Sequence, residues 1–142
     1  MKQNQQFLSA LLKTIQTGQV EIRSLLDTSL GSSLRNTLES QLREYDSIET
    51  EAYTIALQRG WELPELDPAV KYMSKMMSKA KLARGNADSK IAGMMIQGNT
   101  MGVVKSMRSQ RSLTVTDPQV MALSQKLLKT EQNNIDAMKR YL

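Results

Sequence analysis

Hydrophobic residues recur along most of this chain at spacings of three and four, which is the period of an amphipathic helix. The first stripe ends near residue 26, where the sequence DTSLGSS brings in glycine and hydroxyl residues. The second stripe occupies residues 33–59 and stops at Gly60, a natural helix end. The positions in these two stripes are Leu8, Leu11, Ile15, Gly18, Ile22 and Leu25, then Leu34, Leu38, Tyr45, Ile48, Ala52 and Ile55.

Two Asp-Pro pairs predict helix starts after the second stripe. An aspartate can cap the free amides of a first turn, and a proline fits there because its missing N–H is not needed. Asp67-Pro68 therefore begins a short helix that ends near residue 84, and Asp117-Pro118 begins a last helix that runs nearly to the C-terminus. A longer helix is expected between them, over residues 87–111.

Strand signals are scarce, since aromatic residues make up 4% of the chain and no long alternating β-branched run occurs. The balance of 40% hydrophobic and 23% charged residues is typical of a globular domain, and no apolar run is long enough for a transmembrane segment. The sequence predicts an all-α fold: one domain over residues 1–142, an up-down antiparallel bundle of four long helices with an extra short helix before the third.

The composition excludes several kinds of chemistry. The chain of 142 residues has no cysteine, which removes disulfides, thiol nucleophiles and sulfur-ligated metals. It also has no histidine, which removes the usual proton shuttle at neutral pH and the commonest metal ligand. Enzymes that depend on these side chains are therefore excluded.

Two stretches carry a resemblance to a known family. LRNTLESQLREYDSIETEAYTIALQRGW forms a long amphipathic helix that ends in Gly-Trp, and KIAGMMIQGNTMGVVKSM precedes the final Asp-Pro helix. Together they resemble the ferritin-like bundles of the bacterial spore coat protein F family and related small proteins, over residues 5–142. The resemblance implies a ferritin-like bundle of bacterial origin that is cytoplasmic or spore-associated.

The metal ligands of catalytic ferritin-like proteins are not retained. Such proteins use a glutamate from each of two helices and a Glu-x-x-His motif from each of the other two. Here the last helix offers Glu131 and Asn134, and the first offers only Glu21. The second offers Glu44 and Ser47, or Glu49 beside Tyr45. The third long helix has no glutamate. The sequence thus predicts no metal centre, no cofactor and no catalytic residue.

Glu131 is the most unusual position in the final helix, because it interrupts an apolar stripe. We expect it to belong to a buried polar cluster with Tyr45, Glu49 and Asn134. Three interpretations remain open: a hydrogen-bonded residue that fixes helix register, a ligand-binding or catalytic residue, or a surface residue if the helical register differs. The stripe comprises Met121, Leu128, Ile135 and Leu142, interleaved with Ser124, Glu131 and Met138, and the further hydrogen-bond donors considered for Glu131 are Gln41, Gln97 and Lys105.

Three glycines, Gly93, Gly98 and Gly102, fall inside the third long helix, where each costs about 1 kcal/mol relative to alanine. Gly98 and Gly102 lie on the same face, one turn apart. This spacing favours the close approach of a neighbouring backbone, and a kink or room for a ligand are the alternatives.

A basic stretch lies between the second and third long helices. Residues 71–84 carry five positive charges and no acid, which equals the net charge of +5 of the whole chain. Lys71, Lys75 and Lys79 share one helical face. The first interpretation is a solvated face on a helix that packs over the bundle. The second is a surface that binds an acidic protein partner or a second copy of the chain, and an anionic membrane surface is a further alternative. Nucleic acid is not expected, because only Tyr72 interleaves with the lysines.

The function predicted first is that of a non-catalytic structural or protein-interaction bundle, ferritin-like but without a metal centre, associated with a spore coat. The protein is not expected to be an enzyme. The alternative is a ligand-binding or enzymatic bundle that uses the buried polar cluster around Glu131.

Overall fold

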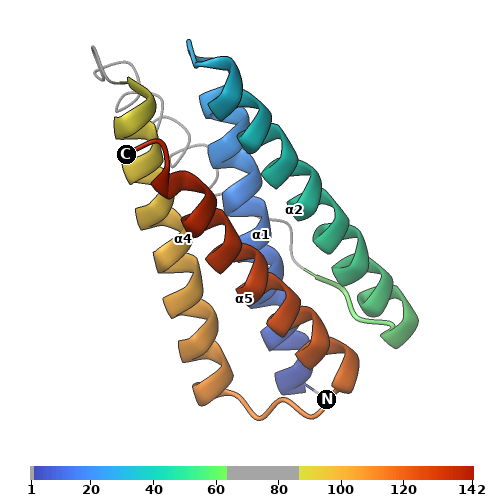
Figure 1. Cartoon of the computed structure of the whole chain (residues 1–142). Helices are drawn as coiled ribbons and strands as arrows, with labels where there is room; N and C mark the ends of the chain where they lie inside the picture. Colours follow the sequence, from blue (N-terminus) through green and yellow to red (C-terminus); the bar gives the residue numbers. More distant parts are fainter. Residues whose placement is uncertain (1, 64–86) are drawn as a thin grey trace.

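The computed structural model describes residues 2–63 and 87–142, which form four helices and no strand in these ranges (Figure 1). The helices are α1 (Lys2–Leu26), α2 (Ser32–Arg59), α4 (Ala87–Ser112) and α5 (Pro118–Lys139). The predicted all-α bundle is confirmed. The extra short helix, with its Asp67-Pro68 start, lies outside the described residues.

Neighbouring helices in the bundle are antiparallel. α1 packs against α2 and α4, and α5 packs against the same two helices from the other side (Figure 1). α2 and α4 run in the same direction, so the chain must reach the opposite end of the bundle between them. This corrects the simple up-down order, in which every helix reverses the one before it.

Hydrogen bonds at the two ends of the bundle fix this arrangement. At one end, the Asn4 side chain at the start of α1 donates to Thr116 Oγ1, just before α5, over 3.1 Å. At the other end, the Gly31 amide before α2 donates to Asp88 Oδ1 in the first turn of α4, over 3.2 Å. The helices are therefore tied together at both ends by polar side chains.

The end of α2 follows the sequence prediction. Gly60 adopts the left-handed backbone conformation with φ of 69°, which favours glycine because it has no Cβ. The amide of Trp61 then donates to the Ala56 carbonyl over 2.9 Å, which satisfies a carbonyl of the last turn.

The start of α5 also follows the prediction, and it links two helices. Asp117 Oδ1 accepts from the amides of Gln119 and Val120 over 3.0 and 3.3 Å. Arg59, at the end of α2, donates from Nε to Asp117 Oδ2 over 2.8 Å. This guanidinium holds the pKa of Asp117 below its usual value. One carboxylate thus caps α5 and joins it to α2.

We expect Asp117→Ala to destabilise the protein by about 1–2 kcal/mol, because the amides of Gln119 and Val120 lose their acceptor. Asp117→Asn keeps a capping oxygen and should cost less. Equilibrium unfolding in urea would measure both. A loss below about 0.5 kcal/mol for the alanine variant would mean that water replaces the cap without penalty.

The face that α5 turns to the core differs from the predicted stripe. Ser124, Glu131 and Met138 are buried as expected, but Leu128 is only half-buried and Leu142 is 66% exposed. The predicted positions Met121, Leu128 and Ile135 are each replaced in the buried face by the residue before them. These buried residues are Val120, Leu127 and Asn134. Apolar residues occur in both registers of this helix, so its sequence alone does not discriminate between them.

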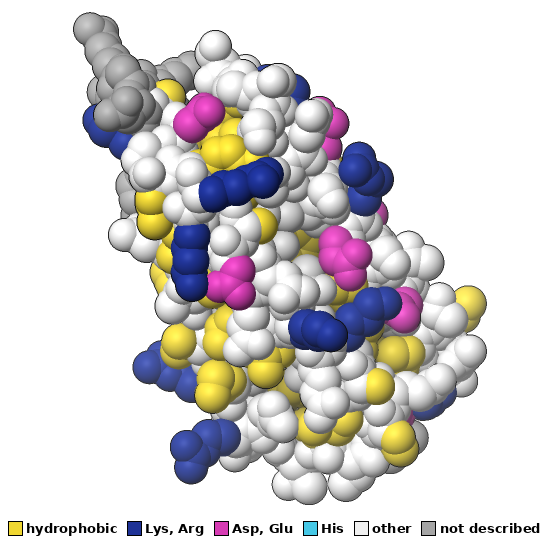
Figure 2. All heavy atoms as spheres, viewed as in Figure 1, with side chains coloured by type: hydrophobic (Ala, Val, Ile, Leu, Met, Phe, Trp, Pro, Cys, Tyr) yellow, Lys and Arg dark blue, Asp and Glu magenta, His cyan; other side chains and the backbone are white. Residues whose placement is uncertain are grey.

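The outer surface carries charges of both signs. Figure 2 shows basic and acidic side chains interspersed over the face formed by α2, α4 and α5. Hydrophobic side chains also reach the surface, including Met101, Val104 and Met107 at three-residue spacing on α4. None of the helices in the described ranges is apolar enough over a sufficient length to cross a membrane.

Candidate ligand-binding site

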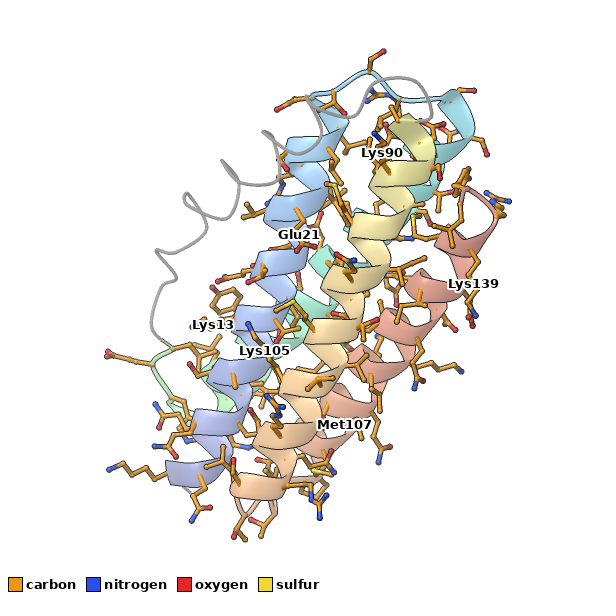
Figure 3. The ribbon with its side chains drawn as sticks, turned by 90° about the vertical axis from the view of Figure 1, so that its left-hand side faces the viewer. Lys13, Glu21, Lys90, Lys105, Met107 and Lys139 are labelled. Atoms are coloured by element: carbon orange, nitrogen blue, oxygen red, sulfur yellow. The ribbon has the colours of Figure 1, made fainter. Side chains whose placement is uncertain are left out.

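A cavity of about 340 Å³ opens between α1 and α4 and reaches into the centre of the bundle. Figure 3 looks onto this side and places Lys13 and Lys105 near its middle, with Glu21 farther along α1. The volume is within the range of small-molecule sites. All four helices contribute to its wall: Leu11, Thr14, Gly18 and Glu21 from α1, Tyr45 from α2, Gly98, Asn99, Gly102, Lys105, Ser106 and Arg108 from α4, and Glu131 from α5.

A polar network crosses the inner end of the cavity. Tyr45 is 1% exposed, and its hydroxyl donates to Asn99 Oδ1 over 3.0 Å. The Asn99 amide donates in turn to the Met95 carbonyl over 2.8 Å, which fixes which way the amide points. Asn134 on α5 donates to the Tyr45 hydroxyl over 3.5 Å, a long hydrogen bond. The hydroxyl of Tyr45 is therefore held between α4 and α5.

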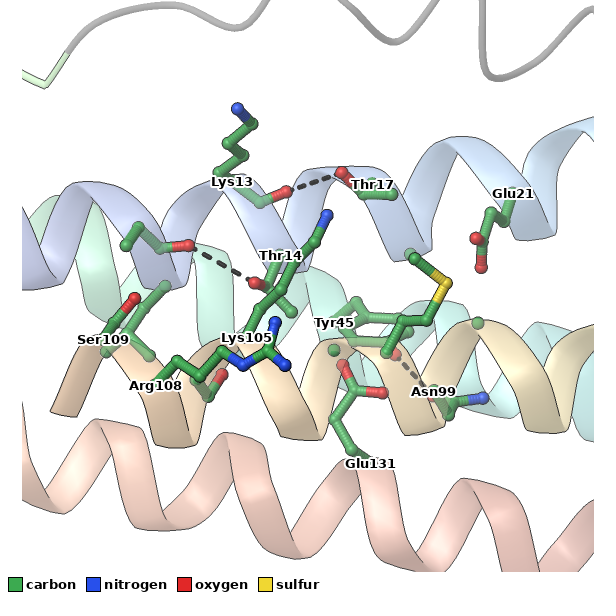
Figure 4. Close-up of a pocket in the computed structure, with 17 residues that line it drawn as sticks. Lys13, Thr14, Thr17, Glu21, Tyr45, Asn99, Lys105, Arg108, Ser109 and Glu131 are labelled. Carbon is green, nitrogen blue, oxygen red and sulfur yellow. Dashed lines mark hydrogen bonds between the residues drawn. The ribbon is translucent and has the colours of Figure 1, made fainter. Parts of the chain in front are cut away.

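Glu131 lies beside this network, and its carboxyl group points from α5 into the cavity (Figure 4). The residue is 2% exposed, and within the described part of the chain its Oε2 accepts no hydrogen bond. Burial raises the pKa of Glu131 to about 8. The hydroxyl of Tyr45 opposes this rise, and the nearby Glu21 adds to it. At neutral pH the carboxyl group of Glu131 is thus mainly protonated and neutral.

A second carboxyl group, that of Glu21, lines the same cavity from α1 and is 4% exposed. Burial and the proximity of Glu131 raise the pKa of Tyr45 well above its usual value, so the phenol remains neutral. Two buried carboxyl groups and a neutral phenol therefore share one end of the cavity. Such a group of acceptors suits a cation that brings its own hydrogen-bond donors.

Glycines make room for each of these three side chains. A Cβ at Gly98 would lie 3.0 Å from both Glu21 oxygens, and one at Gly102 would lie 3.1 Å from Glu131 Oε1. A Cβ at Gly18 would lie 2.7 Å from Cζ of Tyr45. Close packing at Gly98 and Gly102 was predicted correctly, but the groups that approach are carboxyl groups and not a neighbouring backbone.

The outer half of the cavity is basic. Lys105 and Arg108 project from α4 beside the cavity, whereas Lys13 on α1 points away from it (Figure 4). All three side chains are exposed. The ion pairs found among the described residues join Arg23 to Asp46, Arg59 to Asp117, Lys126 to Glu51 and Lys139 to Asp136, so none of them involves these three cations.

The predicted buried cluster is assembled in part. Tyr45, Glu131 and Asn134 lie together, which makes the surface interpretation of Glu131 wrong. Glu49 lies apart from them, because it is half-buried between α1 and α2 and accepts hydrogen bonds from Gln16 and Gln19 over 3.1 and 3.2 Å.

The further donors considered for Glu131 are placed differently from one another. Gln97 is exposed and points away from the core. Gln41 is buried, but its amide has no hydrogen-bond partner in the described ranges. Lys105 lines the cavity with Glu131 and stays exposed at its outer side. The predicted partner-binding lysines, Lys71, Lys75 and Lys79, lie outside the described residues.

Two residues of the site, Glu21 and Asn99, were not predicted to join Glu131. Each carried a weak signal: Glu21 is a charged residue next to the apolar stripe of the first helix, and Asn99 follows Gly98 within GNTMG. Among residues 2–63 and 87–142, no group of three or more acidic residues lies close enough together to hold a metal ion.

Comparisons with known proteins support the fold. No protein-family model and no curated protein matches the sequence. A solved structure does match: the crystal structure of a DUF305 fragment from Deinococcus radiodurans superposes with a TM-score of 0.76 and 16% identity. The match covers 99% of this chain and 95% of that one. At this identity the similarity shows a shared helical-bundle fold and nothing about activity.

Proposed function

We propose that this protein is a non-catalytic bundle that binds a small molecule carrying a protonated amino group. The observation that supports this most concerns Glu131, which lines the cavity and whose buried Oε2 atom lacks a hydrogen-bond partner in the described part of the chain. Burying a carboxyl oxygen without a hydrogen bond costs free energy. A glutamate with a purely structural role would therefore be expected to have its buried oxygens hydrogen-bonded. An ammonium group would supply the missing donors.

Glu21 and Tyr45 suit the same ligand. An ammonium between the two carboxyl groups of Glu21 and Glu131 would have acceptors on two sides, and the Tyr45 hydroxyl supplies a further oxygen. Gly98 and Gly102 have no side chain, which leaves space for the carboxyl groups of Glu21 and Glu131. Each glycine costs helix stability, which is consistent with space kept for these groups and their ligand.

Binding of n-pentylamine at pH 8.5, measured by calorimetry, tests the proposal, with pentan-1-ol as the neutral probe of the same length. We expect the amine to bind at least tenfold more tightly than the alcohol, because only the ammonium pairs with the carboxylates. Glu131→Gln should weaken amine binding by tenfold or more, which corresponds to about 1.4 kcal/mol. Glu44→Gln, the same change at an exposed position of α2, should have no effect.

Equal affinities for the amine and the alcohol, or an unchanged affinity in Glu131→Gln, would overturn the proposal. The pH dependence gives an independent readout. Because the Glu131 pKa is about 8, binding at lower pH must release its proton, and affinity should fall up to tenfold for each pH unit below 8. The groups that face Glu131 across the cavity are Glu21, Tyr45, Lys105 and Arg108.

A structural or protein-interaction role is the second candidate. The exposed stripe of Met101, Val104 and Met107 on α4 favours it, since adaptable methionine side chains suit protein contacts. Association with a spore coat, and a ferritin-like relationship closer than the shared bundle, stay predictions. An interaction through this stripe should survive Glu131→Gln, whereas amine binding should not.

A further inference from the structure

The charges of the cavity are separated along its length. α1 and α4 are antiparallel neighbours. A residue nearer the C-terminus of α4 therefore faces a residue nearer the N-terminus of α1. Gly98 faces Glu21, and Gly102 lies against Thr14, whose Cγ2 would be 3.3 Å from a Cβ there. The carboxyl groups therefore lie at one end, and Lys105 and Arg108 follow toward the other.

The spacing of the two charged ends can be estimated from helix geometry. Glu131 lies level with Gly102, as the short distance to its Oε1 shows. Lys105 and Arg108 come three and six residues later on α4, which is about 4.5 and 9 Å along the helix axis. The backbone positions of the two charged ends are therefore roughly 5–9 Å apart along the helix axis, and we take this as the approximate span of a ligand that touches both.

The basic end is available to a ligand. Lys105 and Arg108 are exposed, form no ion pair with the described residues, and stand beside the hydroxyl groups of Thr14 and Ser109. An arginine fork and a lysine together suit a carboxylate. Between the two ends, the walls include apolar side chains such as Leu11 and Met101, which suit methylene groups.

We propose that the ligand is an ω-amino acid, with its ammonium group between Glu21 and Glu131 and its carboxylate between Lys105 and Arg108. This deepens the proposed function and rests on it, because the ammonium end is the same. A simple amine would fill only the acidic end and leave the two cations solvated. In 5-aminopentanoate, five bonds of about 1.5 Å join the nitrogen to the carboxyl carbon, and they reach roughly 6 Å when extended.

Calorimetry at pH 8.5 with 5-aminopentanoate, n-pentylamine and pentanoate tests this directly, since the three probes share one chain length. We expect 5-aminopentanoate to bind at least tenfold more tightly than n-pentylamine, and pentanoate to bind more weakly than either. The advantage of the amino acid over the amine should shrink at high salt, because Lys105 and Arg108 are exposed.

Substitutions assign the effect to residues. Lys105→Gln and Arg108→Gln should each weaken binding of 5-aminopentanoate by about threefold or more, and together should reduce it to the level of n-pentylamine. Arg111→Gln, at an exposed position of the same helix outside the cavity wall, is the matched control and should change nothing.

The outcomes separate the two proposals. If n-pentylamine binds and 5-aminopentanoate binds no better, the carboxylate end is wrong and the amine site stands. If the double variant keeps the full advantage of 5-aminopentanoate, Lys105 and Arg108 do not bind the carboxylate, and the inference is overturned. If neither amine binds, both proposals fail. Melting temperatures of the variants should match that of the unchanged protein, since these side chains are exposed.

Discussion

The unliganded protein should lose stability as the pH rises from 5 to 8, by on the order of 3–5 kcal/mol. The cause is Glu131, whose pKa is about 8 in the folded protein against an ordinary value of 4.5. Between these two values the folded chain holds a proton that the unfolded chain releases. The stabilisation is therefore complete below about pH 4.5 and is lost progressively as the pH approaches 8.

Urea unfolding at pH 5, 6, 7 and 8 would measure this dependence. The chain has no histidine, so few other groups change their charge in this window. Glu131→Gln should remove most of the slope, and Glu44→Gln should keep it, since Glu44 is exposed on α2. Parallel slopes in the unchanged protein and Glu131→Gln would show that Glu131 is not the titrating group.

Glu131→Leu extends the same test. Leucine has no charge to desolvate, so this variant should be more stable than the unchanged protein at pH 8, where Glu131 is costly. It should also lose the binding of n-pentylamine. A register-fixing role would give the opposite result, because the network around Tyr45 would lose a partner and stability would fall at every pH.

The helices of this fold were predictable from local signals. Periodic leucine and isoleucine residues, the left-handed Gly60 and the cap at Asp117 act within one or two turns, so the sequence records them directly. The relative directions of α2 and α4 were not predictable. More than 20 residues separate these helices, and such a segment is long enough to reach either end of a bundle.

Only those features of the site that are visible within a single helix could be predicted from the sequence. Glu131 stands out because a charged residue interrupts an apolar face, and that signal lies within α5. Glu21 and Asn99 join it only because α1 lies beside α4, a fact of packing that no single helix records. Gly98 and Gly102 predicted a close approach correctly, but their partners come from α1 and α5 and so could not be identified.

The glycines of this bundle should respond to alanine in opposite directions. Alanine favours a helix over glycine by about 1 kcal/mol wherever its methyl group fits. At Gly93 on α4, the nearest group to a new Cβ is Leu142 Cδ2 at 4.0 Å, an ordinary contact. Gly93→Ala should therefore stabilise the protein, by up to about 1 kcal/mol.

At Gly18 the same substitution meets the ring of Tyr45, with Cζ at 2.7 Å and Cε2 at 2.8 Å. The ring cannot move away cheaply, because it is buried and its hydroxyl is bonded to Asn99. Overpacking of this kind costs on the order of 1–3 kcal/mol. Since both variants gain the same helix propensity, Gly18→Ala should be less stable than Gly93→Ala by about this amount in equilibrium unfolding.

Binding gives this comparison a second readout. A displaced Tyr45 ring would disturb the wall beside Glu131, so Gly18→Ala should also weaken the binding of n-pentylamine, while Gly93→Ala should leave it unchanged. If Gly18→Ala stabilises the protein as much as Gly93→Ala does, the Tyr45 ring has room to move. In that case the packing of α1 against α2 at this point does not hold the phenol in place, and the cavity wall at Tyr45 can rearrange.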